Sequence, residues 1–486
     1  MKRFIAVFIL LIMIVSVFSG CGSSPVPEID SVEVPQMIEL TGKSAKYSGS
    51  GVVINSNVIT INAEGEYHMT GTLSDGQVVI NTGDTAGTVY LYLENADLNC
   101  LTAPAIYVLQ AKKLHIVLPE GTANRIVSGR EEDMAGYDGS ANGGAIFGED
   151  DIDIEGAGSL EIFGYINNGI TGKDDVKIEG GNITIVAANN GIKGSESVAV
   201  RGGTLSITCG NDGIKSTSSN KDGKGFVQLD GGTVNINPVG DGISAETELI
   251  INGGELSVTT TGNSLSESCK AIKANNTITL SGGTLDLVSD DNAISSKEAI
   301  IVSGATVNAV SSSRKGMHAA EQIQISGGSV SITSVEDGIQ TKGDISITGG
   351  TVKVNSGEDC IKSGDKDDTT ASATGTVTLT GGDLFLTAAG DPIEAKLSFV
   401  CTGGMVFGTG SPKNPKAPGA GTTQSYISVS FRGKAGDHLT VFGEGVEESL
   451  DTAYDYTYVL FVSSGLTKGS SYKLSTEDSS ATVKAS

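Results

Sequence analysis

The sequence predicts an all-β fold, a right-handed parallel β-helix with coils of about 22 residues, an irregular N-terminal cap and a C-terminal β segment. Apolar and polar residues alternate around glycine pairs, as in Val176-Lys177-Ile178 and Ile183-Thr184-Ile185, which is typical of half-buried strands. A fixed period of this length indicates a solenoid, and parallel crossovers favour right-handed coiling. The first glycines of successive pairs lie 22 residues apart at Gly180 and Gly202, Gly231 and Gly253, Gly282 and Gly304, Gly327 and Gly349, and Gly381 and Gly403.

One apolar residue per coil follows a short turn such as Asp212-Gly213. We expect it to point into the coil, because stacked coils bury a continuous ladder of such residues. The ladder comprises Ile146, Ile170, Ile192, Ile214, Ile243, Ile272, Ile294, Met317, Ile339, Ile361 and Ile393, with Ile106 as an earlier candidate.

The period divides the chain. Residues 36–100 contain strands without the regular spacing and are predicted to form an N-terminal β cap, since the end of a solenoid would otherwise expose strand edges. Residues 101–404 form the predicted parallel β-helix, and residues 405–486 the C-terminal β segment. Insertions are expected at 129–144, 216–225, 260–268 and 364–375, where loop residues interrupt the coils.

The first residues have the pattern of a secretory signal. Residues 1–20 begin with Lys2 and Arg3 and continue with an apolar run, and Ser19-Gly20-Cys21 resembles a bacterial lipobox. The resemblance implies cleavage before Cys21 and its lipidation, with residues 22–35 as a tether. The expected location is the extracellular face of the bacterial cell membrane, reached only through the lipid anchor; an uncleaved anchor or an ordinary secretory signal is the alternative.

Charge and cysteine content limit the functions. The chain has 57 acidic and 32 basic residues, which argues against nucleic acid as a partner. The cysteines beyond Cys21 are odd in number, so a disulfide framework is not expected, and Cys209 and Cys401 are interpreted as buried free thiols. The protein is expected to be a monomer.

An acidic row lies two residues before the apolar ladder, at a position expected to be exposed. Stacked carboxylates repel one another, and a calcium ion bound by them would relieve this. The alternative is that these side chains cap their own turns. The predicted calcium ligands in this row are Asp337, Asp359 and Asp391 with Glu336 and Glu358, followed by Asp212 and Asp241.

Two further rows could carry function. Asp150, Asp151, Asp174 and Asp175 precede the first strand of their coils and are a second candidate calcium row, or simply charged turns. Basic residues follow the ladder by one position, and they could contact an anionic sugar or form salt bridges with neighbouring acids. The ligand-binding candidates among them are Lys193, Lys215 and Lys362.

Several motifs together resemble a known family, the carbohydrate-binding β-helical lipoproteins typified by a clostridial cellulose- and pectin-binding surface protein, within the pectate-lyase-like superfamily. This resemblance implies a calcium-containing β-helix that binds plant cell-wall polysaccharide. The motifs are Gly49-Ser50-Gly51-Val52, Gly71-Thr72-Leu73-Ser74-Asp75-Gly76-Gln77, Ala145-Ile146-Phe147, Asn168-Gly169-Ile170, Asp212-Gly213-Ile214-Lys215, Ser464-Gly465-Leu466 and Gly469-Ser470-Ser471-Tyr472.

Three functions remain open at this point. The first is non-catalytic, calcium-assisted binding of pectin or cellulose; because the chain has no Trp, an acidic pectin fits better than flat crystalline cellulose. The second is a calcium-dependent pectate-type lyase, in which Lys193, Lys215, Lys273 or Lys362 would remove a proton. The third is an adhesive surface rod with a protein partner. No catalytic residue is assigned.

Overall fold

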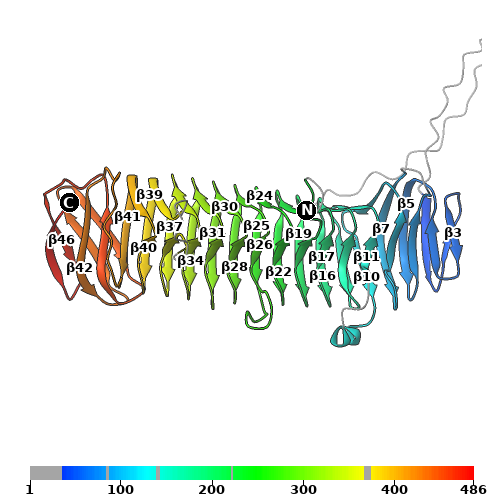
Figure 1. Ribbon diagram of the computed structural model, residues 1–486. Coiled ribbons are helices and arrows are strands. Elements are labelled where there is room, and N and C mark those ends of the chain that lie inside the picture. Colours follow the sequence, from blue (N-terminus) through cyan, green and yellow to red (C-terminus); the bar gives the residue numbers. More distant parts are fainter. Residues whose placement is uncertain (1–35, 84–86, 138–142, 220–222, 366–373) are drawn as a thin grey trace, which may run out of the picture. The chain divides into compact units, whose positions relative to one another are not determined.

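The computed structural model describes residues 36–83, 87–137, 143–219, 223–365 and 374–486. The predicted signal sequence, Cys21 and the predicted tether lie outside the described residues. Gln36–Ser486 form one compact unit, in which parallel strands stack coil upon coil (Figure 1). The predicted parallel β-helix is therefore confirmed. No helix in the described ranges is long and apolar enough to cross a membrane.

Each regular coil contributes one strand to each of three parallel ladders. In the described residues the first ladder comprises β9 (Lys113–Leu118), β12 (Asp151–Gly156), β15 (Asp175–Ile178), β18 (Ser197–Val200), β21 (Phe226–Leu229), β24 (Leu249–Ile251), β27 (Ile278–Leu280), β30 (Ala299–Val302), β33 (Gln322–Ile325) and β36 (Asp344–Ile347). The second comprises β10 (Ala123–Ser128), β13 (Ser159–Gly164), β16 (Asn182–Ala187), β19 (Thr204–Cys209), β22 (Thr233–Pro238), β25 (Glu255–Thr259), β28 (Thr284–Ser289), β31 (Thr306–Ser311), β34 (Ser329–Ser334) and β37 (Thr351–Ser356).

The third ladder is a separate sheet and positions the candidate site. Its strands are short because each is confined between two turns. In chain order they are β3 (Val52–Asn55), β4 (Val58–Ile61), β6 (Gln77–Asn81), β8 (Ile106–Gln110), β11 (Gly144–Gly148), β14 (Asn168–Gly172), β17 (Ile192–Gly194), β20 (Ile214–Ser216), β23 (Ile243–Ala245), β26 (Ile272–Ala274), β29 (Ile294–Ser296), β32 (Met317–Ala319), β35 (Ile339–Thr341), β38 (Ile361–Ser363) and β40 (Ile393–Ala395).

Both ends of the stack differ from its middle. At each end of the stack, one long strand per coil takes part in both the first and the second ladder. These strands are β5 (Gly65–Leu73) and β7 (Thr88–Cys100) at the start, and β39 (Thr376–Ala388) and β41 (Ser398–Gly410) at the other end. At the start, β1 (Gln36–Gly42) pairs antiparallel with β2 (Ala45–Tyr47), and β3 with β4. At the other end, β45 (Tyr456–Val462) pairs antiparallel with both β41 and β42 (Tyr426–Gly433). A separate sheet is formed by β43 (His438–Gly443), β44 (Val446–Asp451), β46 (Ser471–Ser475) and β47 (Ser480–Lys484).

The core is the predicted apolar ladder. Ile146, Ile214 and Ile339 are completely buried, as are most other members of the ladder. Burying one such side chain stabilises the fold by about 1.5–3 kcal/mol. All five cysteines of the described residues are free and buried, as predicted for Cys209 and Cys401.

Glycine is required where coils approach closely. Gly203 has φ +80°, and a Cβ there would lie 2.5 Å from the Gly181 carbonyl oxygen of the preceding coil. Gly213 precedes the ladder residue of its coil, and a Cβ there would lie 2.2 Å from Ile236 Cγ2. The repeating glycines therefore follow from the stacking itself.

Candidate functional site

The outer side of the third ladder, which we call the third face, carries one outward side chain per coil. Strand order places all four predicted insertions beside it: 129–144 and 260–268 connect the second ladder to the third, while 216–225 and 364–375 connect the third to the first. The first of these contains a 3-10 helix, η1 (Glu131–Gly136), that projects from the stack (Figure 1). The strand register sets the outward residues in the order Thr60, Val79, Tyr107, Phe147, Thr171, Lys193, Lys215, Ser244, Lys273, Ser295, His318, Gln340, Lys362 and Glu394.

A groove of about 950 Å³, the N-terminal groove, crosses the third face at β8, β11, β14 and β17. Tyr107 and Phe147 lie in register on its floor, with ring centroids 5.5 Å apart. Tyr137, directly after η1, and Gly143 add to its wall. Aromatic rings that remain half-exposed offer an apolar surface to a ligand, and a Tyr hydroxyl adds a polar group at the ring edge.

Amide side chains form one rim of the N-terminal groove. Asn189 Nδ2 donates to Asn167 Oδ1 at 3.0 Å, and Asn211 Nδ2 donates to Asn189 Oδ1 at 3.0 Å. The Tyr137 hydroxyl lies 3.3 Å from Asn167 Oδ1. The ladder fixes the amides at the spacing of the coils, so their remaining donors and acceptors form a regular polar edge beside the rings.

Two lysines give this groove a positive charge. Lys173 is held by Glu149 at 2.8 Å and lies 5.8 Å from the centre of the Phe147 ring. Lys193 also lines the groove, and it makes no ion pair with any residue in the described part of the chain. Lys193 is therefore the lysine of this groove that is available to an anionic group.

The first acidic row is mostly buried, whereas the sequence was interpreted as placing it in solvent. Asp212, Asp241 and Asp337 are 4%, 1% and 2% exposed. Seven Asn and Asp side chains at this position use Oδ1 to accept a hydrogen bond from the backbone N–H at the same position of the next coil. The bonds run from Asn190 N to Asn168 (2.9 Å), Asp212 N to Asn190 (3.2 Å), Asp241 N to Asp212 (2.9 Å), Lys270 N to Asp241 (2.8 Å), Lys315 N to Asn292 (3.1 Å), Asp359 N to Asp337 (3.2 Å) and Asp391 N to Asp359 (2.8 Å).

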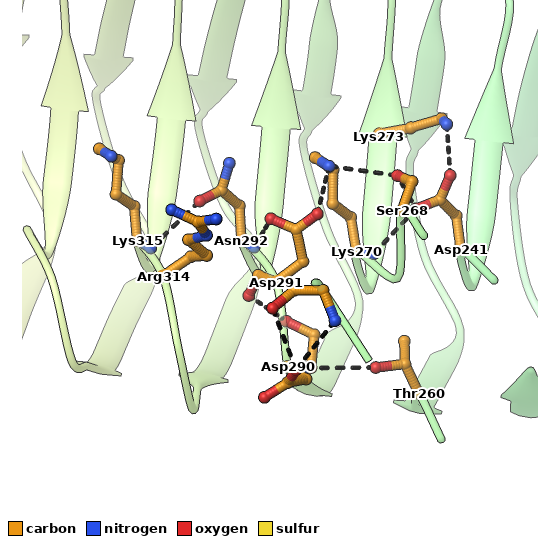
Figure 2. Close-up of polar contacts among 12 residues, drawn as sticks. Asp241, Thr260, Ser268, Lys270, Lys273, Asp290, Asp291, Asn292, Arg314 and Lys315 are labelled. Atoms are coloured by element: carbon orange, nitrogen blue, oxygen red, sulfur yellow. Dashed lines mark hydrogen bonds and ion pairs between the residues drawn. The ribbon is translucent and has the colours of Figure 1, made fainter. Parts of the chain in front are cut away.

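Lysines pair with the buried carboxylates through Oδ2, except at Asp337, where the contact is to Oδ1. Lys215 Nζ lies 2.7 Å from Asp212, and Lys273 pairs with Asp241 (Figure 2). Lys362 lies 2.8 Å from Asp359 and 3.4 Å from Asp337. The salt-bridge alternative for Lys215 and Lys362 is therefore what the structure contains.

Where lysine itself occupies the row, it reaches sideways to a carboxylate of the next coil. Lys270 contacts Ser268 at 3.1 Å and pairs with Asp291 (Figure 2). Lys315 lies 2.8 Å from Glu336, one of the predicted calcium ligands. These ammonium groups occupy the space beside the carboxylates that a cation would need.

The second acidic row is similarly occupied. Asp150 accepts a hydrogen bond from Ala111 N at 3.0 Å, and Asp151 lies 3.7 Å from Lys113. Asp175 is bound by Ser197 at 2.7 Å and by Lys177 at 3.1 Å, and Asp174 also has an interaction partner.

These arrangements do not fit a calcium ion. Calcium requires several oxygen ligands converging on one point, yet most carboxylates of the two rows point to ammonium groups, backbone N–H groups or a hydroxyl. Within the described ranges, no group of three or more His, Cys, Asp or Glu side chains is placed to hold a metal ion. Bound calcium stays a prediction.

Burial and neighbouring charges shift several pKa values around Lys362. Burial lowers the pKa of Lys362, but the hydrogen bond and charge of Asp359 and the charge of Asp337 outweigh it, so the pKa is raised. Burial raises the pKa of Asp391 to about 6, and the charges of Asp359 and Glu394 add to the effect.

Sequence reasoning missed Tyr107, Tyr137 and the amide rim as candidate residues. Tyr107 has a sequence signal, because it follows Ile106 by one position, as Lys193 follows Ile192. Tyr137 has none, since it reaches the groove from an insertion whose path is set by tertiary packing.

Fold and groove together define a solenoid protein with an aromatic and amide-lined groove suited to a polar, ring-containing ligand. A family model described as "Carbohydrate-binding domain-containing protein" matches residues 55–316 and 308–455. The chain therefore belongs to this family of carbohydrate-binding proteins, and the resemblance seen in the sequence is confirmed.

Two known proteins are similar to parts of the chain. A carbohydrate-binding domain-containing protein of Acetivibrio thermocellus is 31% identical over 137 residues, which is 28% of this chain and 48% of the relative. The match thus spans about half of the relative's length. The solved structure of a polysaccharide lyase-like protein from C. thermocellum, a gadolinium derivative, is 31% identical, covers 50% of this chain and 97% of its own, and has a TM-score of 0.45.

Proposed function

We propose that this protein binds a plant cell-wall polysaccharide on its third face without cleaving it, and that lipid on Cys21 anchors it to the extracellular side of a bacterial membrane. The observation that carries the proposal is the Tyr107–Phe147 pair beside the amide rim and Lys193. Sugar rings present apolar faces to aromatic side chains and hydroxyls to amides, and this groove offers both.

Acidic pectin is the proposed ligand in preference to cellulose. A uronate carboxylate can pair with Lys193, which no described carboxylate neutralises. The groove contains no Trp, and its rings come from strands and an insertion that do not form one wide flat surface. A single acidic chain therefore fits the groove better than a crystalline face.

Two of the four candidate lysines, Lys273 and Lys362, argue for binding over lyase chemistry. A general base must be able to lose its proton near the working pH. Burial lowers the pKa of Lys273, but the charge and hydrogen bond of Asp241 outweigh this and raise it, and the pKa of Lys362 is raised as well. Neither lysine is a suitable base at neutral pH.

The test is a pull-down of the purified protein on insoluble polygalacturonate, with calcium and with chelator. We expect retention, and we expect Tyr107→Ala and Phe147→Ala to weaken it by about tenfold, corresponding to about 1.4 kcal/mol. Phe442→Ala is the matched control, because Phe442 is an aromatic residue 56% exposed on β43, outside the groove.

Each outcome separates the alternatives. Retention that chelator abolishes would support calcium assistance, and retention in both conditions would leave binding without calcium. Unsaturated, ultraviolet-absorbing product would contradict the non-catalytic proposal in favour of a lyase. Absence of retention, or equal retention by the Tyr107 and Phe442 variants, would contradict the proposed groove.

A further inference from the structure

A second groove, the C-terminal groove, lies on the same third face. It has a volume of about 760 Å³ and crosses β32, β35 and β38 near the C-terminal end of the stack. His318, Gln340 and Lys362, which are consecutive outward residues of the third ladder, line its floor. It is separate from the N-terminal groove, since the two share no lining residue.

Two neutral polar side chains of this groove are available to a ligand. No hydrogen bond joins the side chain of His318 or Gln340 to another of the described residues. Burial and the positive charges of Lys315 and Lys342 together lower the pKa of His318 to about 4, so the imidazole is neutral at pH 7. A neutral imidazole and an amide can each donate and accept, as sugar hydroxyls require.

The charges around these two residues are not all neutralised. Lys315 and Lys362 are paired with acids. By contrast, Lys416 donates to the Ala395 carbonyl oxygen at 3.1 Å and forms no ion pair within the described ranges. Lys342 lies 3.2 Å from Asp365 with its side chain 66% exposed, and an exposed pair of this kind is weak. Lys342 and Lys416 can therefore meet a carboxylate, while exposed Glu358 adds a negative charge to the lining.

The spacing of the grooves suits one extended ligand. From Lys193 in the N-terminal groove to His318 in the C-terminal groove the register advances five coils. At about 4.8 Å per coil the gap is about 24 Å. The outward row between them is continuous, so a chain lying along the stack can reach both grooves.

We propose that the C-terminal groove is a second binding site for a carboxylated sugar, and that one acidic polysaccharide chain occupies both grooves at once. His318 and Gln340 contact sugar hydroxyls there, and Lys342 and Lys416 contact the carboxylate. The inference rests on the proposed function in taking an acidic polysaccharide as the ligand. Joining two sites through one ligand raises affinity strongly when the ligand spans both.

Calorimetric titration with oligogalacturonates of increasing length tests the inference. Oligomers too short for the gap should bind at two sites per protein. Oligomers long enough to span it should bind one per protein, at least about tenfold more tightly. Neutral gluco-oligosaccharides of the same lengths should show no such gain.

Variants distinguish the two grooves. Lys342→Ala combined with Lys416→Ala should remove one short-oligomer site and the gain with length, while Tyr107→Ala should leave the C-terminal site measurable. Glu358→Gln is the matched control and should tighten binding slightly by removing a negative charge. If the double variant folds poorly, Lys342→Ala alone serves as the test, because Lys342 is exposed and its replacement should not disturb folding.

One-site binding of short oligomers, or affinity that does not depend on length, would overturn the inference and leave the N-terminal groove standing. Two short-oligomer sites that both persist in the Lys342 and Lys416 variants would also overturn it. Short-oligomer binding that Tyr107→Ala leaves unchanged would instead contradict the proposed function.

Discussion

The hydrogen-bond ladder beside the third face is built from amides at Asn168 and Asn190 and from carboxylates at Asp337 and Asp359. In both stretches the side-chain oxygen accepts the N–H of the next coil, at 2.9 Å from Asn168 and 3.2 Å from Asp337. The amide stretch needs no counter-ion. The carboxylate stretch is accompanied by Lys362, which contacts both aspartates.

This difference shows which lysines stabilise the fold by pairing with a buried carboxylate and which remain available to a ligand. A buried carboxylate is costly unless it is paired, and the aspartates at 212, 241, 337 and 359 each have a neighbouring lysine. Asn190 makes the same backbone contact without charge, and Lys193, three residues later, is left for a ligand. The choice of Asn or Asp in the ladder thus decides which lysines of the third face can bind.

Replacing Lys362 should have the largest effect. Lys362→Met would leave Asp337 and Asp359, 3% and 10% exposed, without their cation, and we expect the free energy of unfolding to fall by about 3 kcal/mol. Denaturant unfolding measures this. Lys342→Met, at an exposed pair, should cost less than about 1 kcal/mol.

A rescue would sharpen the same comparison. Adding Asp337→Asn and Asp359→Asn to Lys362→Met recreates the amide stretch, and most of the lost stability should return. If the triple variant were no more stable than Lys362→Met alone, the buried charge would not be the cause.

Asn190→Asp should convert an amide coil into a carboxylate coil. The new carboxylate can pair with Lys193 as Asp212 pairs with Lys215 at 2.7 Å. We expect stability to change by less than about 1 kcal/mol, because the new ion pair offsets the buried charge, and polygalacturonate binding to weaken several-fold, because Lys193 is withdrawn.

A double-mutant cycle checks that reason. Lys193→Met should weaken binding to a similar extent, and Asn190→Asp should add little to it. Independent, additive losses would show that Asn190→Asp acts elsewhere than through Lys193.

A pH-dependent effect is expected at Asp391, where the carboxylate stretch ends. Its pKa is raised from 3.8 to about 6 by burial and by the charges of Asp359 and Glu394. The folded state therefore binds the proton more tightly than the unfolded state, and the free energy of unfolding falls as pH rises from about 4 to about 6. Asp391→Asn should remove this slope and stabilise the protein by about 1 kcal/mol above pH 6, after allowance for solvent screening. An unchanged slope between pH 4 and 6 would contradict the assignment.

Much of the architecture was predictable because stacking imposes a strict period. The glycine pairs, the alternating strands and Ile214 with its counterparts all follow from one coil repeating against the next. The acidic row was recognised by the same spacing, but its burial was not. The sequence predicts that Asp212 lies in a turn. Its carboxylate is buried because it accepts a hydrogen bond from the neighbouring coil, and this contact is visible only in the tertiary structure.

The sequence by itself determined the solenoid, its inward ladder and the family, because these depend on residues at fixed separations along one chain. Tertiary structure decided which polar residues are used internally and which remain available. Lys215 and Lys193 occupy equivalent positions, yet one is bound to Asp212 and the other lines a groove with Tyr107 and Tyr137. That distinction depends on contacts between coils and on the path of an insertion, which no local spacing encodes.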